Sequence, residues 1–238
     1  RRPQPRALVG KSFAILLPLC GVLCALLLAA TAQSRAPLGD SIGNSLWLGL
    51  CSALLGAVVC LLWLALGPSR FGGWIWLPLI LPALPLVDGQ YQLALYTWQD
   101  GEWLTVLWGH LLWVVPWMLF ILHPARRAAD PRAELVARTL GWHQGRIFWL
   151  VTLPALTRPL LTALAVGFSV SIAQYLPTLW LGGGRIPTLT SEAVALSSGG
   201  DIATLAAQAL WQLLLPAMFF ALTALLAWPI GRYRQGLR

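Results

Sequence analysis

Charged side chains are scarce in this sequence: aspartate, glutamate, lysine and arginine make up only 10% of the 238 residues, whereas apolar residues make up 58%. The mean hydropathy is +0.72. A soluble domain uses far more charge on its surface, so the composition excludes that class. The apolar residues form long uninterrupted runs, which predicts an all-α, polytopic membrane protein in contact with lipid.

Acidic residues are rarer than basic ones, with 8 against 16, and the net charge is +8. A positive charge of this size can indicate nucleic-acid binding. Here, however, the basic residues stand at the ends of apolar runs and not on a polar face with interleaved aromatic residues. The charge therefore indicates membrane topology, and we expect no nucleic-acid partner.

Residues for catalysis and metal binding are also few. The four cysteines lie within apolar runs without a nearby histidine ligand, so we expect no metal site. His123 and Asp130 are too far apart for a membrane acyltransferase pair, and His110 and His143 have no evident partner. No Walker-type phosphate loop is found. We predict no catalytic residue and no bound cofactor, so another subunit must hydrolyse any ATP used.

Six apolar segments predict six transmembrane helices. They cover residues 12–32, 45–66, 74–98, 103–122, 156–179 and 202–230. The third segment contains several prolines and admits two interpretations: one kinked helix with Asp88 at membrane depth, or a span that ends at Val87 with Asp88 in water. Residues 74–87 would make only about 21 Å of helix, less than the hydrocarbon thickness, which favours the kinked helix.

The basic residues predict the orientation in the membrane. Fourteen of the 16 fall in residues 1–11, at Arg70, in residues 123–158 or in residues 231–238. These segments share one side of a six-span protein, and the positive-inside rule places them, with both termini, in the cytoplasm. Residues 12–230 then form one transmembrane domain, 1–11 a cytoplasmic segment and 231–238 a cytoplasmic tail. The glycine-rich connection 182–200 is predicted to be external.

Residues 123–158, between the fourth and fifth spans, form the largest basic segment. Within it, helix 131–140, a break at Gly141 and helix 143–150 predict a short helical hairpin on the membrane surface. The glycine is followed by nine residues and then by Val151, Leu153 and Pro154.

This pattern resembles the permease subunits of binding-protein-dependent ABC importers, whose signature in the same loop is Glu-Ala-Ala-x3-Gly-x9-Ile-x-Leu-Pro. The matching residues are Ala137, Gly141, Val151, Leu153 and Pro154. Leu135 holds the family's glutamate position, and Glu134 lies one residue earlier. The resemblance covers most of residues 40–230. The first residue is arginine and not methionine, and the chain resembles the second repeat of a fused permease of the thiamine, ferric-iron or YnjC type.

The resemblance implies that the hairpin is a coupling helix docking on a cytoplasmic ABC ATPase subunit in the bacterial inner membrane. The docking residues predicted on this basis are Ala137, Arg138, Gly141, Trp142, His143 and Arg146. Ala137 and Gly141 would allow close backbone approach, while the two arginines would pair with acidic groups. Further partners implied are a periplasmic solute-binding protein and a second permease repeat or subunit.

Polar residues within apolar segments predict a solute pathway, because such residues are costly unless they face a cavity or a partner. The predicted set is Asp88, Gln90, Gln92, Ser169, Ser171 and Gln174. It would favour a cationic or polar solute. Two alternatives remain: an ion-coupled secondary transporter with Asp88 as proton relay, and, with less support, an integral-membrane enzyme.

Overall fold

The structure, a computed structural model, describes residues 38–66, 73–97, 99–199 and 202–235. Throughout these residues the regular elements are helices, and no strand occurs among them. The all-α prediction is confirmed for this part of the chain.

Within the described residues, four helices are long and apolar enough to cross a membrane. They are α2 (Gly39–Leu66), α5 (Trp103–Ala128), α8 (Leu153–Ile172), which continues the helical segment from Gln144, and α11 (Ile202–Gln235). These helices correspond to the predicted second, fourth, fifth and sixth spans. The predicted first span, residues 12–32, lies outside the described residues.

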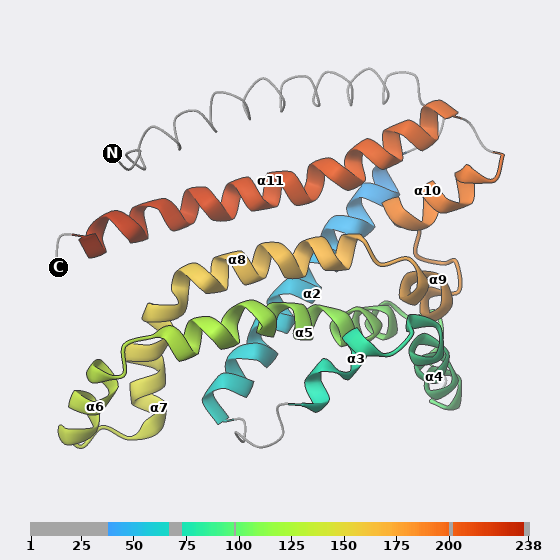
Figure 1. Ribbon diagram of the computed structural model, residues 1–238. Coiled ribbons are helices and arrows are strands. Elements are labelled where there is room, and N and C mark those ends of the chain that lie inside the picture. The colour runs from blue at the N-terminus through green and yellow to red at the C-terminus, as the bar shows by residue number, and fades with distance from the viewer. Residues whose placement is uncertain (1–37, 67–72, 98, 200–201, 236–238) are drawn as a thin grey trace.

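Helix α8 lies at the centre of the fold, where it packs against α2, α5 and α11. Figure 1 shows α5, α8 and α11 running side by side, with α2 passing across them. Small residues permit the closest crossing: a Cβ added to Gly56 of α2 or Gly167 of α8 would lie 2.9 Å or 2.7 Å from Met118 Sδ of α5. Glycines at helix crossings let backbones approach closely, as is common between membrane helices.

The outer surface of the long helices is apolar. Trp47, Leu54, Phe120 and Leu213 are 58–61% exposed. A soluble protein rarely exposes so many large apolar side chains in one contiguous zone. Their exposure agrees with helices whose outer faces contact lipid.

The prediction of one kinked helix over residues 74–98 is wrong. A 3-10 turn η1 (Trp74–Trp76) and α3 (Leu77–Ile80) end at Leu81, and α4 (Ala83–Tyr96) begins after Pro82. Leu81 and Pro82 have extended ψ angles of 148° and 139°. The residue before a proline is driven out of the helical region, which explains the break. Neither α3 nor α4 is among the helices long enough to span.

Two boundaries at the far end of the bundle also differ from the prediction. The fifth span ends at Ile172 and not at residue 179, because α9 (Leu176–Gly182) is a separate helix with Pro177 in its first turn. The connection 182–200 contains α10 (Leu189–Ser197), which begins with a capping box between Thr188 and Ser191. The glycines of this connection suggested an irregular loop, so the short helix was not predicted. Its start is defined by the reciprocal hydrogen bonds of the capping box.

Two further helices extend beyond their predicted limits. Helix α5 continues past residue 122 to Ala128, and α11 continues past residue 230 to Gln235, into the predicted tail. In both cases the polar residues that suggested a membrane boundary did not end the helix. A helix can project beyond the hydrocarbon because its backbone hydrogen bonds do not depend on the apolar environment.

Candidate functional site

The predicted hairpin is present, and its first limb is α6 (Arg132–Thr139). The helix ends in a Schellman motif: the N–H of Gly141 donates to the carbonyl of Arg138 at 3.0 Å, and the N–H of Trp142 donates to that of Ala137 at 3.1 Å. Gly141 has φ +79°, and a Cβ added there would meet no atom within 4 Å. Gly141 is therefore required within the chain for its left-handed backbone.

The second limb is α7 (Gln144–Ile147), followed by a π-helical turn η2 (Phe148–Thr152) that runs directly into α8. Helix α6 packs against both α7 and η2. Figure 1 shows α6 and α7 together at one end of the bundle, while α4 and α9 lie at the other. The hairpin is thus continuous, through one π-helical turn, with the helix at the centre of the fold.

Glu134 joins three elements at the base of the hairpin. Its Oε1 forms an ion pair with Arg126 Nη1 at 2.8 Å and accepts from the Thr152 hydroxyl at 2.8 Å, and its Oε2 accepts from Arg126 Nη2 at 3.1 Å. The Glu134 side chain is only 14% exposed. We call these three residues the clasp: Arg126 is near the end of α5, Glu134 in the first turn of α6, and Thr152 at the end of η2.

The charge of Glu134 is stabilised by its surroundings. Burial by itself would raise the pKa of the Glu134 carboxyl. The hydrogen bonds from Thr152 and Arg126, together with the positive charges of Arg126 and Arg138, outweigh that effect and hold the pKa below its ordinary value of about 4.5. The carboxylate is therefore ionised at neutral pH.

The predicted docking residues do not all face outward. Arg138, Gly141, His143 and Arg146 are exposed, Trp142 is half-buried, and Ala137 is buried. Arg138 donates to the side chain of Gln144 at 3.2 Å, and the Arg146 guanidinium lies 4.5 Å from the centre of the Trp142 ring. Ala137 is covered by the protein's own chain, so its small size serves packing inside the hairpin.

Apolar side chains on α6 were not among the predicted docking residues, although the structure exposes them. Leu135, Val136 and Leu140 are 57%, 59% and 67% exposed. These residues could have been predicted as docking residues from their apolar character within the most basic segment of the chain. An exposed apolar patch beside arginines is typical of a protein contact surface.

The three residues that end the motif lie where the hairpin enters α8. Val151 is in the π-helical turn and is half-buried, Leu153 begins α8 and is half-buried, and Pro154 follows in the first turn of that helix and is exposed. Proline has no N–H to donate to the preceding helical turn, and Pro154 lies just after the π-helical turn, where the hydrogen-bond register of the helix changes.

The predicted pathway residues are distributed over several elements and are not brought to one place. Asp88 and Gln92 are exposed and lie four residues apart on α4, whereas Gln90 is buried on the same helix. Ser169 and Ser171 are on α8, and Gln174 follows that helix. Gln90 has neither side-chain polar atom hydrogen-bonded, and the Gln174 Oε1 also has no partner among the described residues. Buried polar atoms without protein partners commonly contact water.

A polar cluster in the interior includes two of these residues, and it corrects the expectation that His110 lacks a partner. His110 Nδ1 lies 2.8 Å from the Ser171 hydroxyl, and its Nε2 lies 2.9 Å from the Thr178 hydroxyl. Ser171 donates to Ser52 at 3.2 Å, and the Gln174 amide donates to the His110 carbonyl at 3.2 Å. This histidine cluster connects α2, α5, α8 and α9 without a carboxylate or arginine.

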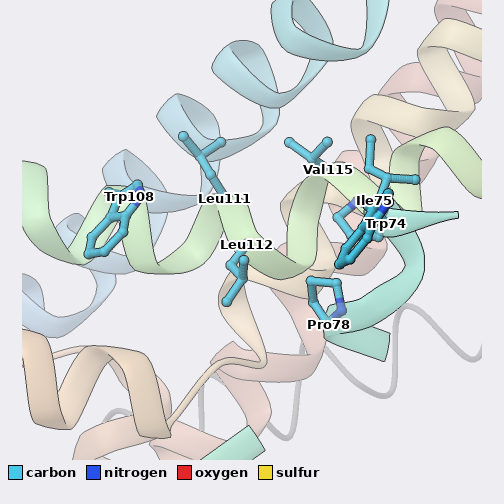
Figure 2. A pocket seen from close by; sticks show the side chains of 8 residues that line it. Trp74, Ile75, Pro78, Trp108, Leu111, Leu112 and Val115 are labelled. Carbon is cyan, nitrogen blue, oxygen red and sulfur yellow. The ribbon is translucent and has the colours of Figure 1, made fainter. Parts of the chain in front are cut away.

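A cavity of about 280 Å³ lies between α3 and α5. Figure 2 shows its walls, which consist of Trp74, Ile75, Pro78, Trp108, Leu111, Leu112, Val115 and Pro116. No ionisable side chain lines it, so it offers no chemistry for a charged ligand. No group of three or more histidine, cysteine, aspartate or glutamate side chains suited to a metal ion occurs in the described part of the chain.

The four apolar helices, with the hairpin at one end, define an α-helical multi-pass membrane protein. No family model matches the chain. Over all 238 residues it is 58% identical to the inner membrane ABC transporter permease protein YnjC of Escherichia coli K12, a match that covers 47% of that protein. Over its whole length the chain is therefore similar to an ABC transporter permease, and it spans about half the length of this relative.

Two shorter matches agree with this assignment. Over 51% of the chain and 43% of the relative, the sequence is 28% identical to a spermidine/putrescine transport system permease protein PotC homolog of Mycoplasma genitalium. Over 30% of the chain and 27% of the relative, it is 34% identical to the molybdenum transport system permease protein ModB of Mycobacterium tuberculosis. The relatives named here are transport components.

Proposed function

We propose that this chain is the transmembrane permease subunit of an ATP-driven, binding-protein-dependent importer in the bacterial inner membrane. The observation that carries the proposal is the hairpin α6–α7, with Gly141 at its turn and a continuous helical connection to α8. A rigid hairpin joined to the central helix of the bundle is suited to pass motion from a partner into the membrane domain.

The hairpin surface supports docking on a cytoplasmic ABC ATPase subunit. It presents the cations of Arg138 and Arg146 beside the apolar side chains of Leu135, Val136 and Leu140. Cations of this kind pair with acidic groups, and exposed apolar side chains gain from being covered. ATP is bound and hydrolysed by the partner, and this chain itself binds no cofactor.

The opposite end of the bundle is proposed to face the periplasm and to receive a solute-binding protein. In the predicted six-span topology, 14 of the 16 basic residues would share the hairpin's side of the membrane, which supports this orientation with both termini in the cytoplasm. A second permease repeat or subunit would supply the other half of the pathway. Asp88, Gln92 and Ser169 are the candidates that this chain contributes. The Gln90 side chain and the Gln174 Oε1, which have no partner among the described residues, support a hydrated route nearby.

The proposed cycle follows from these connections. Closure of the ATPase subunits moves the hairpin, α8 moves with it because the two are continuous, and α2, α5 and α11 follow through their packing on α8. The pathway then switches between outward and inward access. Tight packing at Gly56 and Gly167 favours movement of these helices as a unit.

Cysteine cross-linking tests the docking surface. In a background without the four native cysteines, Leu140→Cys on the hairpin should cross-link to a single cysteine on the ATPase subunit, because Leu140 is 67% exposed. Val194→Cys is the matched control: it is 41% exposed but lies on α10, at the other end, and should form no such product. Absence of a Leu140→Cys product with every linker length would contradict the proposed function.

A further inference from the structure

The base of the hairpin carries an ion pair that the docking surface does not use. Among the described residues, Arg126–Glu134 is the only salt bridge between side chains. Its two parallel contacts, at 2.8 Å and 3.1 Å, have the bidentate geometry that gives arginine–carboxylate pairs both strength and direction. With side-chain exposures of 27% and 14%, the pair is more shielded from water than a typical surface pair.

Glu134 is directed inward, toward residues of its own chain. Oε1 accepts a hydrogen bond from Thr152 and is ion-paired with Arg126, and Oε2 accepts a second hydrogen bond, from Arg126; all these contacts come from this chain. The next residue, Leu135, points to solvent and is 57% exposed. The one-residue offset between Glu134 and the family's glutamate position therefore places a carboxylate on the inner face of α6 and a leucine on the outer face.

Thr152 adds the third element to this contact. A threonine in a helix commonly bonds a backbone carbonyl of its own preceding turn. The hydroxyl of Thr152 instead donates to Glu134, 18 residues away in sequence, from a buried position at the end of the π-helical turn. The π-helical turn that joins the hairpin to α8 is thus hydrogen-bonded to Glu134 of α6. Glu134 in turn pairs with Arg126 near the end of α5.

We propose that Glu134 is a positioning residue that holds the end of α5, the hairpin helix α6 and the entrance of α8 as one rigid unit. Motion of the hairpin would then be delivered to α5 and α8 together. Without the clasp, motion of α6 would reach α5 through the connection 129–131 and, less directly, through the packing of η2 and α8. This inference rests on the proposed function, since it concerns how a docked ATPase moves the membrane domain.

The clasp is tested in the complete transporter complex, purified with its ATPase and binding-protein partners. Glu134→Gln keeps the shape of the side chain but removes its charge, and Thr152→Val removes only the hydroxyl. Arg127→Gln is the matched control, because Arg127 is an exposed neighbour on the same helix end. Amide hydrogen exchange over residues 132–142 reports the rigidity of α6, and ATP hydrolysis with and without binding protein reports coupling.

We expect Glu134→Gln to raise amide exchange in α6 roughly fivefold, Thr152→Val to raise it less, and Arg127→Gln to leave it unchanged. Binding-protein stimulation of ATP hydrolysis should fall severalfold in Glu134→Gln, while unstimulated hydrolysis persists. Adding Arg126→Gln to Glu134→Gln should change exchange little further, because the two residues act through the same contact.

Each contrary result would overturn the inference: exchange in Glu134→Gln equal to that in Arg127→Gln, increased exchange with full stimulation, or additive effects of Arg126→Gln and Glu134→Gln. Failure of the proposed function is recognised separately. If the function is wrong, Leu140→Cys does not cross-link to the ATPase. If only the clasp is wrong, that cross-link forms while the clasp variants behave like the control.

Discussion

The clasp and the histidine cluster are both polar contacts between helices, but they use different chemistry. The clasp pairs formal charges, Arg126 and Glu134, beside one hydroxyl at the hairpin end of the bundle. The histidine cluster joins His110 to the hydroxyls of Ser171 and Thr178 in the interior of the bundle, without an ionic partner. Each joins residues of different helical elements.

The difference reflects the surroundings of the two clusters. Partly exposed side chains retain some hydration, so an ion pair can form there without the full cost of desolvating two charges. Within an apolar bundle that cost rises steeply, whereas hydroxyl groups and a neutral imidazole can satisfy one another's hydrogen bonds. Polar contacts between helices therefore use charged groups at the hairpin and neutral groups in the interior.

Replacing His110 should lower the free energy of unfolding more than the other changes proposed below. His110→Leu leaves the hydroxyls of Ser171 and Thr178 without their imidazole partner in a buried site, and we expect the free energy of unfolding to fall by about 2 kcal/mol. His123→Leu, a half-buried position near the end of the same helix, should cost less than about 0.5 kcal/mol. Denaturation in detergent measures both variants, and equal losses would show that the histidine cluster contributes no special stability.

A smaller loss of stability is expected when Gly141, at the turn of the hairpin, is replaced. Gly141→Ala should cost about 1 kcal/mol, because Gly141 has φ +79° and alanine is strained there even though its Cβ would meet open space. Gly145→Ala is the matched change in α7, where alanine is the better helix former, and should be neutral or stabilising. Thermal unfolding of the two variants distinguishes a conformational requirement at Gly141 from a general intolerance of side chains in the hairpin.

Acid should weaken the clasp by the smallest amount, less than about 1 kcal/mol. The folded-state pKa of Glu134 lies below its ordinary value of about 4.5, so its stabilising contribution is complete above that pH and is lost as the pH falls through the folded pKa. The free energy of unfolding of the wild type should therefore decrease more than that of Glu134→Gln between pH 5 and pH 3, by the contribution of this carboxyl. Parallel pH profiles for the two proteins would contradict a stabilising role for the charge.

Much of the site could be predicted from sequence because its signals are local. Gly141 marked the turn of the hairpin, since a left-handed helix end favours glycine. The apolar runs located the four long helices of the described residues. The breaks at Pro82 and before Pro177 were missed because membrane helices also tolerate proline within their length. Whether a proline kinks or ends a helix depends on whether neighbouring helices supply hydrogen-bond partners for the freed backbone groups. The residues around the proline in the sequence do not show this.

The clasp and the histidine cluster could not be predicted for a related reason. Arg126, Glu134 and Thr152 are separated by 8 and 18 residues, and His110 and Ser171 by 61. Spacing over a few residues predicts which side chains share a helix face, but contacts over longer separations depend on how whole helices pack. The expectation that His110 lacked a partner failed because its partners lie on other helices.

The sequence by itself determined that this chain is helical and membrane-embedded, with a basic hairpin that turns at a glycine, because composition, hydrophobic length and backbone preference act locally. Tertiary structure alone decided that Glu134 faces inward while Leu135 faces outward, and that His110 is enclosed by hydroxyls. These outcomes depend on the relative placement of α5, α6 and α8, and that placement is set by packing across the whole bundle.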